Sequence, residues 1–183
     1  MEVLIALVFT RELVGSNPHS SIGGKMIIWC EKPELQIYSD IVPITTVCKP
    51  LPDDSEEVRK YKKKFPYRNM KDVTFDVHYL GTHYPIFIDD AFRWNGTNCL
   101  GLQHYPKLLD ASCVHDLLCN NHELVNQDRQ LSSMIFREIG IASGVNKAFM
   151  YTAYYCVDNF QKVWGKDLLG RRWKTPVAQG DSV

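Results

Sequence analysis

The spacing of apolar residues changes once along the chain, from a period of two to a helical period. In the first half, apolar residues alternate with polar ones or gather in short β-branched runs. Successive side chains of a strand point to opposite faces, so this pattern is typical of half-buried strands. The predicted strands are Met26–Cys30, Leu35–Tyr38, Ile41–Cys48, Val73–Leu80 and Tyr84–Ile88. Gly81-Thr82-His83 has a turn composition, which makes residues 73–88 a predicted β-hairpin.

From Leu108 onward, apolar residues recur at helical spacing. Leu109–Asn121 is the first predicted helix. A second helix is expected to begin after the cap residue Asn126 and to end at Gly140. A third is expected to begin after the cap residue Ser143 and to end at Gly165. The apolar stripe expected to bury the third helix is Val145, Phe149, Thr152, Cys156, Phe160 and Val163. Strands first and helices last predict an α+β fold, in which a small, mainly antiparallel sheet packs on a three-helix C-terminal unit.

The length of 183 residues suits one domain with a core of its own. Residues 15–24 are rich in Gly, Ser, Asn and Pro, a linker composition, so residues 1–24 are expected to form an arm. Residues 25–165 are then the single α+β domain. Residues 166–183 are expected to form a polar, loosely ordered tail.

A charged segment interrupts the strands between Leu51 and Asp72. Ser55-Glu56-Glu57 is a helix start with acids in its first turn, and five basic residues follow before Pro66. One interpretation is a solvated helix or loop insertion. The alternative is a basic patch for phosphate groups, with Tyr61, Phe65 and Tyr67 interleaved.

Basic and acidic residues both number 21, so the formal net charge is zero and any binding to nucleic acid needs a local patch. The pattern predicts no transmembrane segment. Val3–Phe9 is a short apolar run preceded by Glu2, so no signal peptide is expected. The six cysteines match no metal-binding framework and are interpreted as reduced thiols, while their even number leaves disulfides open.

The main candidate for chemistry is the stretch Cys113–Cys119, which contains a His-Asp pair, together with Asp128 downstream. His115 can act as a general base if a carboxylate orients it. Asp116 points about 100° away around the helix and is a poor partner. Asp128, at the start of the neighbouring antiparallel helix, is better placed, which leaves Asp116 free to hold a cation or a backbone group. The alternative is purely structural: Asp128 caps its helix, and His115 is a satisfied core residue.

A zinc site is a further alternative. His115, Cys119 and His122 follow at i, i+4 and i+7 on one predicted helical face, and imidazole and thiolate are zinc ligands. Cys99 or His104, from the preceding loop, would supply a fourth ligand. Three residues so spaced on one helix rarely converge on one tetrahedral ion. The polar and aromatic loop Asp89–Asn98 has the composition of a loop that borders a site.

The order of these features resembles DUF1353, a family of uncharacterised proteins of bacteriophages and prophages. The likeness covers about residues 26–164, and the segments that carry it are Pro85–Asp90, Ala111–Leu118 with its His-Asp pair, Asp128–Ile141 and Met150-Tyr151. This sequence departs from the family at Leu117-Leu118-Cys119, where aromatic residues are usual, and at Gly96–Cys99, where a small-Ser-x-Pro pattern is usual. The resemblance implies an accessory or structural protein of the virion, located there or in the host cytoplasm, with other phage proteins as partners and no assured activity.

The His-Asp pair followed by a distant Asp is also similar to the catalytic helices of phospholipase A2-type enzymes. That resemblance implies an ester hydrolase in which His115 activates a water, Asp116 binds calcium and Asp128 orients His115. The glycine-rich calcium loop of those enzymes has only a loose counterpart in Asn95–Gly101. The analogy concerns local geometry. The expectation is that the protein has no cofactor, and the alternatives are calcium or zinc.

Overall fold

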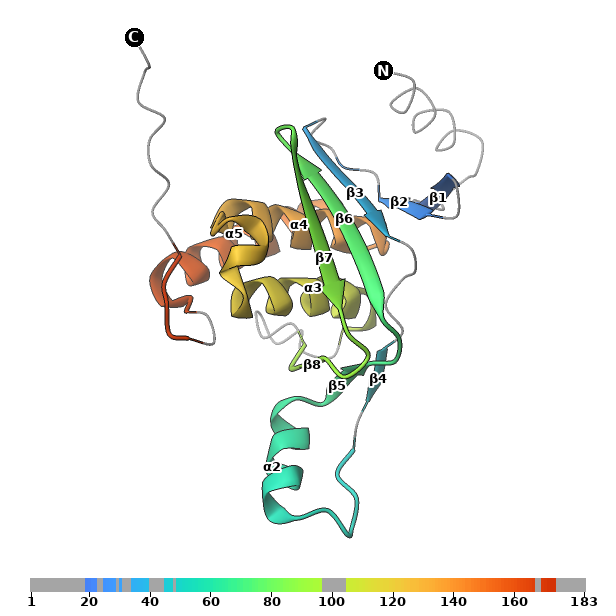
Figure 1. Cartoon of the computed structure of the whole chain (residues 1–183), viewed down its shortest axis with the longest axis vertical. Helices are drawn as coiled ribbons and strands as arrows, with labels where there is room; N and C mark the ends of the chain where they lie inside the picture. The colour runs from blue at the N-terminus through green and yellow to red at the C-terminus, as the bar shows by residue number, and fades with distance from the viewer. Residues whose placement is uncertain are drawn as a thin grey trace.

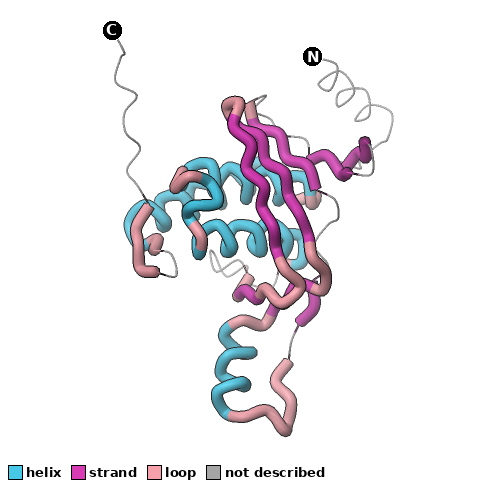
Figure 2. Tube along the Cα trace, viewed as in Figure 1, coloured by secondary structure: helices cyan, strands magenta, loops and turns pink. Residues whose placement is uncertain are grey.

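The computed structural model describes residues 19–22, 25–28, 30, 34–39, 45–47, 49–96, 105–166 and 169–173. It has the predicted α+β fold, with antiparallel strands in the first half and packed helices in the second. The strands form a layer in front of the three long C-terminal helices (Figure 1; Figure 2).

The main sheet has five strands in the order β1-β2-β3-β6-β7, and every neighbouring pair is antiparallel. Alternate side chains of β3 and β6 are buried against the helices, as the alternation predicted. Burial of these apolar residues supplies the main force that holds sheet and helices together. The strands are β1 (His19–Ile22), β2 (Lys25–Ile28), β3 (Leu35–Ser39), β6 (Val73–Tyr79) and β7 (Thr82–Ile88).

The predicted hairpin is present, with a turn one residue earlier than expected. Leu80 and Gly81 join β6 to β7 with φ angles of 48° and 77°. Two consecutive positive φ angles are those of a type I′ turn, whose twist matches that of the strands. Tyr79 is therefore paired with Thr82, and the next pair along the strands is His78 with His83.

A second, three-stranded sheet of β4 (Thr45–Val47), β5 (Tyr67–Asn69) and β8 (Arg93–Trp94) carries the charged insertion. Helix α2 (Glu56–Lys64) leads into β5 and protrudes from the body (Figure 1). Ser55 caps it by accepting a hydrogen bond from the Val58 N–H at 3.3 Å, and no residue of α2 is buried. The solvated-helix interpretation is confirmed. Phosphate binding by this insertion stays a prediction.

The three C-terminal helices are α3 (Leu109–Asn120), α4 (Arg129–Ala142) and α5 (Lys147–Trp164), with short 3-10 helices η1 (Pro106–Leu108) and η2 (His122–Val125) before and after α3. Their existence was predicted, but three of the predicted ends are wrong. Asn126 does not cap α4. It adopts a left-handed conformation, with φ 49°, that ends η2.

The ends of α4 and α5 differ from the prediction because of packing between the two helices. Gly140 lies inside α4, where a Cβ atom would stand 2.4 Å from Met150 Cε. This glycine permits close approach of α5 and is not a stop signal. The helix continues to Ala142, and Asn146, in place of Ser143, caps α5 by accepting a hydrogen bond from Phe149 N–H at 3.2 Å.

The buried face of α5 also differs from the predicted stripe. Met150, Ala153 and Val157 are the residues that this helix buries. Phe160 and Val163, which the pattern assigned to the core, are 60% and 51% exposed. The buried residues are therefore displaced around the helix from the predicted stripe. The sequence shows which residues of α5 are apolar, but it does not show which of them α4 covers.

Both ends of the described chain pack more closely than the expected arm and tail. Strand β1, within the predicted arm, pairs with β2, so residues 19–22 belong to the sheet. Trp173, within the predicted tail, is buried, stacks on His122 with ring centroids 3.6 Å apart and donates its indole N–H to Gln161 Oε1 at 3.1 Å. The remaining parts of the arm, residues 1–18 and 23–24, and of the tail, residues 167–168 and 174–183, lie outside the described residues. Over the described part of the chain, no helix has the length and apolarity needed to cross a membrane.

Candidate functional site

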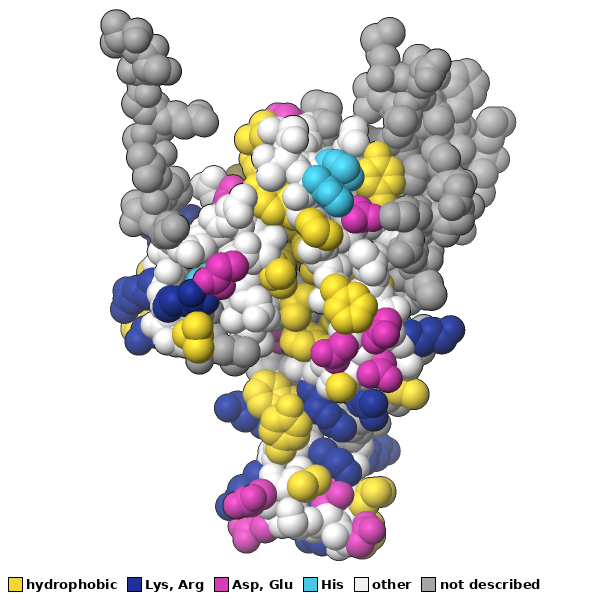
Figure 3. All heavy atoms as spheres, in the orientation of Figure 1, with side chains coloured by type: hydrophobic (Ala, Val, Ile, Leu, Met, Phe, Trp, Pro, Cys, Tyr) yellow, Lys and Arg dark blue, Asp and Glu magenta, His cyan; other side chains and the backbone are white. Residues whose placement is uncertain are grey.

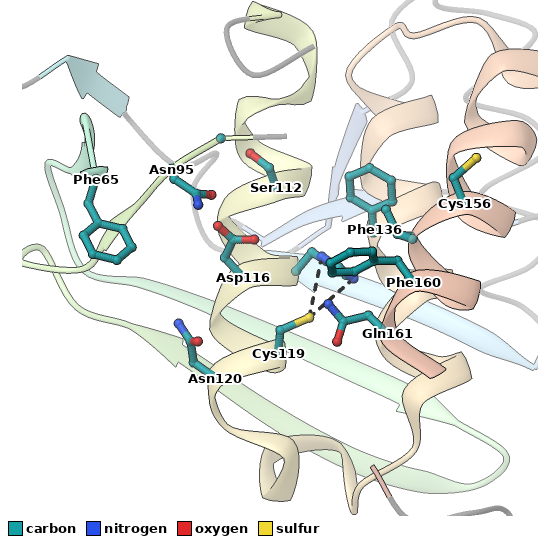
Figure 4. Close-up of a pocket in the computed structure, with 13 residues that line it drawn as sticks. Phe65, Asn95, Ser112, Asp116, Cys119, Asn120, Phe136, Cys156, Phe160 and Gln161 are labelled. Atoms are coloured by element: carbon teal, nitrogen blue, oxygen red, sulfur yellow. Dashed lines mark hydrogen bonds between the residues drawn. The ribbon is translucent and has the colours of Figure 1, made fainter. Parts of the chain in front are cut away.

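A pocket of about 430 Å³ lies between α3 and α5, bordered by the end of α2 and by the loop after β8 (Figure 4). Three phenylalanine side chains, one valine and two cysteines share its wall with six polar side chains. Its lining residues are Phe65, Asn95, Gly96, Ser112, His115, Asp116, Cys119, Asn120, Phe136, Cys156, Val157, Phe160 and Gln161.

Helix α3 is the polar wall of this pocket. Its buried residues hold it against β8 and α4, and the Trp94 indole N–H donates to Ser112 Oγ at 3.2 Å. This bond fixes β8 to α3 and thereby places Asn95 and Gly96 at the pocket. The loop Asp89–Asn98, predicted to border a site, does so through these two residues.

His115 lies at the pocket with 7% of its surface exposed, and its ring centroid is 5.2 Å from that of Phe136. Burial lowers the pKa of His115 to about 4, although the negative charge of Asp158 acts in the opposite direction. The imidazole is therefore neutral near pH 7. It can donate or accept a hydrogen bond in that state, but it is a weak base.

Cys119 is one helical turn beyond His115 and contacts the ring. Its Sγ lies 3.7 Å from His115 Nδ1 and 3.6 Å from His115 Nε2. Because the two distances are nearly equal, the sulfur lies off the lone-pair direction of either nitrogen. Burial, and then the charge of Asp116, raise the pKa of the Cys119 thiol well above its usual value. This pair consists of a neutral thiol and a neutral imidazole, so it is not an activated nucleophile.

Within the pocket, Asp116 is directed toward Asn95, while Cys119 lies on the Phe160 and Gln161 side (Figure 4). Burial raises the pKa of Asp116 to about 7, and a hydrogen bond from the backbone of Asn95 opposes the shift. The backbone contact was one of the two roles expected for Asp116. A carboxyl group that titrates near neutral pH is suited to general acid–base catalysis.

Asp128 does not join His115. It is the N-cap of α4, where its carboxylate accepts a hydrogen bond from Leu131 N–H at 2.9 Å. Within the described ranges, no hydrogen bond links Asp128 to His115, and Asp128 does not line the pocket. The capping alternative describes the observed role. The acid whose charge acts on His115 is Asp158 of α5, which the sequence pattern did not indicate because the two residues are distant in sequence and only the tertiary structure brings them near each other.

We expect Asp128→Ala to cost about 1 kcal/mol of stability through loss of the cap, measured by urea unfolding. Asp128→Ser retains a capping oxygen and removes the carboxylate, so it should restore most of that stability. The serine variant should also keep any catalytic activity of the pocket. Loss of activity in Asp128→Ser with stability retained would instead favour the predicted pairing of Asp128 with His115.

The predicted zinc ligands are not brought together. His115 and Cys119 are neighbours, but His122 belongs to η2 and is buried against Trp173. The helical spacing does not apply to His122 because the chain leaves the helical conformation at Asn121, with φ −136° and ψ 72°. In the part of the chain that the structure describes, no three or more His, Cys, Asp or Glu residues are grouped to hold a metal ion. Cys99 and His104 lie outside it.

Protein-family models, curated proteins and solved structures were all compared with this chain. None of the three comparisons gave a match. Membership of DUF1353 therefore stays a prediction. Calcium binding by Asp116 also stays a prediction. Asp116 accepts a hydrogen bond from the backbone of Asn95, the first residue of the loop Asn95–Gly101 that has a loose likeness to a calcium loop. Residues 97–101 of that loop are outside the described ranges.

Proposed function

We propose that this protein is a small hydrolase that cleaves an ester in the pocket between α3 and α5. The observation that supports it best is that His115 and Asp116 of one helix line the same cavity, together with apolar walls. This arrangement combines a carboxyl group suited to proton transfer with a neutral hydrogen-bonding imidazole. It differs from the predicted dyad of His115 and Asp128, because the proton-transferring group is now Asp116.

In the proposed reaction, the Asp116 carboxylate takes a proton from a water molecule while the water oxygen attacks the ester carbonyl carbon. The carbonyl oxygen becomes negatively charged, and the neutral His115 donates a hydrogen bond to it. As the tetrahedral intermediate collapses, the bond to the alcohol oxygen breaks. Asp116 returns its proton to that oxygen, which leaves a carboxylic acid and an alcohol as products.

The wall composition favours an uncharged substrate with an apolar body. Phe136, Val157 and Phe160 offer aromatic and aliphatic surface, while no Lys or Arg is among the described lining residues. An anionic head group would find no cation in this part of the pocket and would lie near Asp116. We therefore expect neutral esters of medium-length acids to be preferred over phosphate-bearing ones.

The test is hydrolysis of nitrophenyl esters of increasing acyl length by purified protein. We expect Asp116→Asn to lower kcat/KM by about 10²–10⁴, the usual contribution of general acid–base catalysis. The wild-type rate should rise with pH through about 7, as Asp116 loses its proton. Cys119→Ser should remain active, since its thiol is not the nucleophile. Equal rates for the wild type and Asp116→Asn would exclude the proposal.

A second candidate function is that of an accessory or structural protein of a phage particle. It is supported by the large apolar side chains exposed on and after α5, because exposed apolar surface often marks a protein interface. These residues are Tyr155, Phe160, Val163, Trp164 and Leu169. Recovery of the protein in purified particles would support this role, and its absence from them would count against it.

A further inference from the structure

The outer face of the β6–β7 hairpin carries two histidines that lie outside the pocket. His78 and His83 are direct partners across the two strands. Their rings are nearly parallel, with an interplanar angle of 15° and centroids 4.6 Å apart. Histidine side chains form a patch on the exposed sheet surface near the end of the hairpin, with an acidic side chain beside them (Figure 3).

The hairpin holds this pair in a defined register. The type I′ turn at Leu80-Gly81 leaves one residue pair between the turn and the histidines. Directly opposed residues of an antiparallel pair have Cβ atoms about 4.5–5.5 Å apart. The backbone therefore keeps the two imidazoles together, while both side chains remain accessible: His78 is exposed, and half of the His83 side chain is exposed.

Asp76 sets the orientation of one imidazole. Asp76 lies two residues before His78 on β6, and its Oδ1 is 2.9 Å from His83 Nε2. An imidazole that donates its Nε2 proton to a carboxylate keeps the lone pair on Nδ1. Carboxylates hold metal-binding histidines in this way, fixing the tautomer and increasing the basicity of the nitrogen that binds.

We propose that His78 and His83 chelate a divalent transition-metal ion on the outer face of the sheet, with Asp76 as a positioning residue. Neutral imidazoles suit Cu²⁺, Ni²⁺ and Zn²⁺, and Cu²⁺ binds most tightly to a given set of nitrogen ligands. With His83 held by Asp76 and presenting Nδ1, rotation of the exposed His78 side chain about its χ angles turns one of its ring nitrogens toward the same ion. Both ligands come from one hairpin, so binding joins its strands.

The site is an open one. Since no group of three or more ligand side chains exists among the described residues, two protein nitrogens bind the ion and the other positions are left to water. Such a site binds more weakly than a closed structural zinc site. It also leaves room for an added ligand on the metal, as sites that exchange or catalyse do.

The experiment is isothermal titration of tag-free protein with CuCl₂, NiCl₂ and ZnCl₂ at mildly alkaline pH, where imidazoles are neutral. We expect one ion per chain, with Cu²⁺ bound most tightly. His78→Ala and His83→Ala should each lower affinity by about tenfold or more, and Asp76→Asn by about tenfold. Thr74→Ala, on the same strand and face, is the matched control and should bind as the wild type does.

Wild-type protein without saturable binding, or histidine variants with unchanged affinity, would overturn the proposal. Far-UV circular dichroism verifies that the variants fold. A second readout needs no variant, because Ni²⁺ should broaden the NMR resonances of His78 and His83 before those of other residues. Broadening elsewhere first would also overturn it. None of these outcomes tests the proposed hydrolase activity, because the pocket is lined by other residues.

Discussion

Replacing Asp116 by Asn should stabilise the fold above neutral pH by up to about 4 kcal/mol. Burial raises the pKa of this carboxyl from 3.8 to about 7, a shift of about three units at about 1.4 kcal/mol each. Between these two values the folded protein binds more protons than the unfolded chain, so the stability contributed by Asp116 falls as pH rises. Asparagine does not ionise and removes this loss.

His115 should have the opposite effect on stability. Burial lowers its pKa from 6.5 to about 4, so the unfolded chain binds more protons between these values. The stability contributed by the neutral imidazole is present above about pH 6.5 and falls by about 3 kcal/mol as the pH drops to about 4. The slopes due to His115 and Asp116 therefore partly offset each other in the wild type.

Urea unfolding from about pH 4 to about pH 8 measures both effects. Asp116→Asn should show a slope of stability with pH that is more positive than that of the wild type up to about pH 7, because the loss due to Asp116 is absent; Asp110, whose pKa burial raises to about 6, contributes the same loss to both proteins. His115→Gln should show stability that falls with pH up to about 7. The slope of the wild-type curve should lie between the slopes of the two variants. Parallel curves for all three proteins would show that neither group titrates as its burial implies.

Glu138→Ala should destabilise the protein by about 3–5 kcal/mol, the usual cost of removing one partner of a buried ion pair. Glu138 is fully buried, and its Oε1 accepts a hydrogen bond from Arg137 Nε at 2.8 Å. The Arg137 guanidinium also lies over the rings of Tyr151 and Tyr154, at 4.7 and 5.2 Å from their centroids. Alanine would leave that charge buried between α4 and α5 without its carboxylate.

Two controls separate this effect from loss of volume or of surface charge. The double variant Arg137→Met with Glu138→Leu removes both charges and should recover most of the lost stability. Glu56→Ala breaks the exposed pair with Lys60 and should change stability by less than about 0.5 kcal/mol. Urea midpoints give all three values. A double variant as unstable as Glu138→Ala would attribute the loss to packing.

Local patterns explain why parts of the fold were predictable. The alternation over Val73–Tyr79 and the helical spacing in α3 reflect side chains that each element must bury, whatever its neighbours are. The N-cap of α2 at Ser55 depends on residues within one turn. The cap of α4 was misplaced because several polar residues precede that helix, and only the path of the chain through η2 places Asp128 at its start.

The sequence by itself determined the α+β order, the hairpin and the presence of His115, Asp116 and Cys119 on one helix, because these depend on short-range spacing. Only the tertiary structure decided which side chains meet. It separated Asp128 from His115, buried His122 against Trp173 and opened a pocket beside Phe160. Burial in that packed interior then shifts the pKa of His115 down and that of Asp116 up. Desolvation of a side chain depends on the elements that cover it, which residue spacing does not reveal.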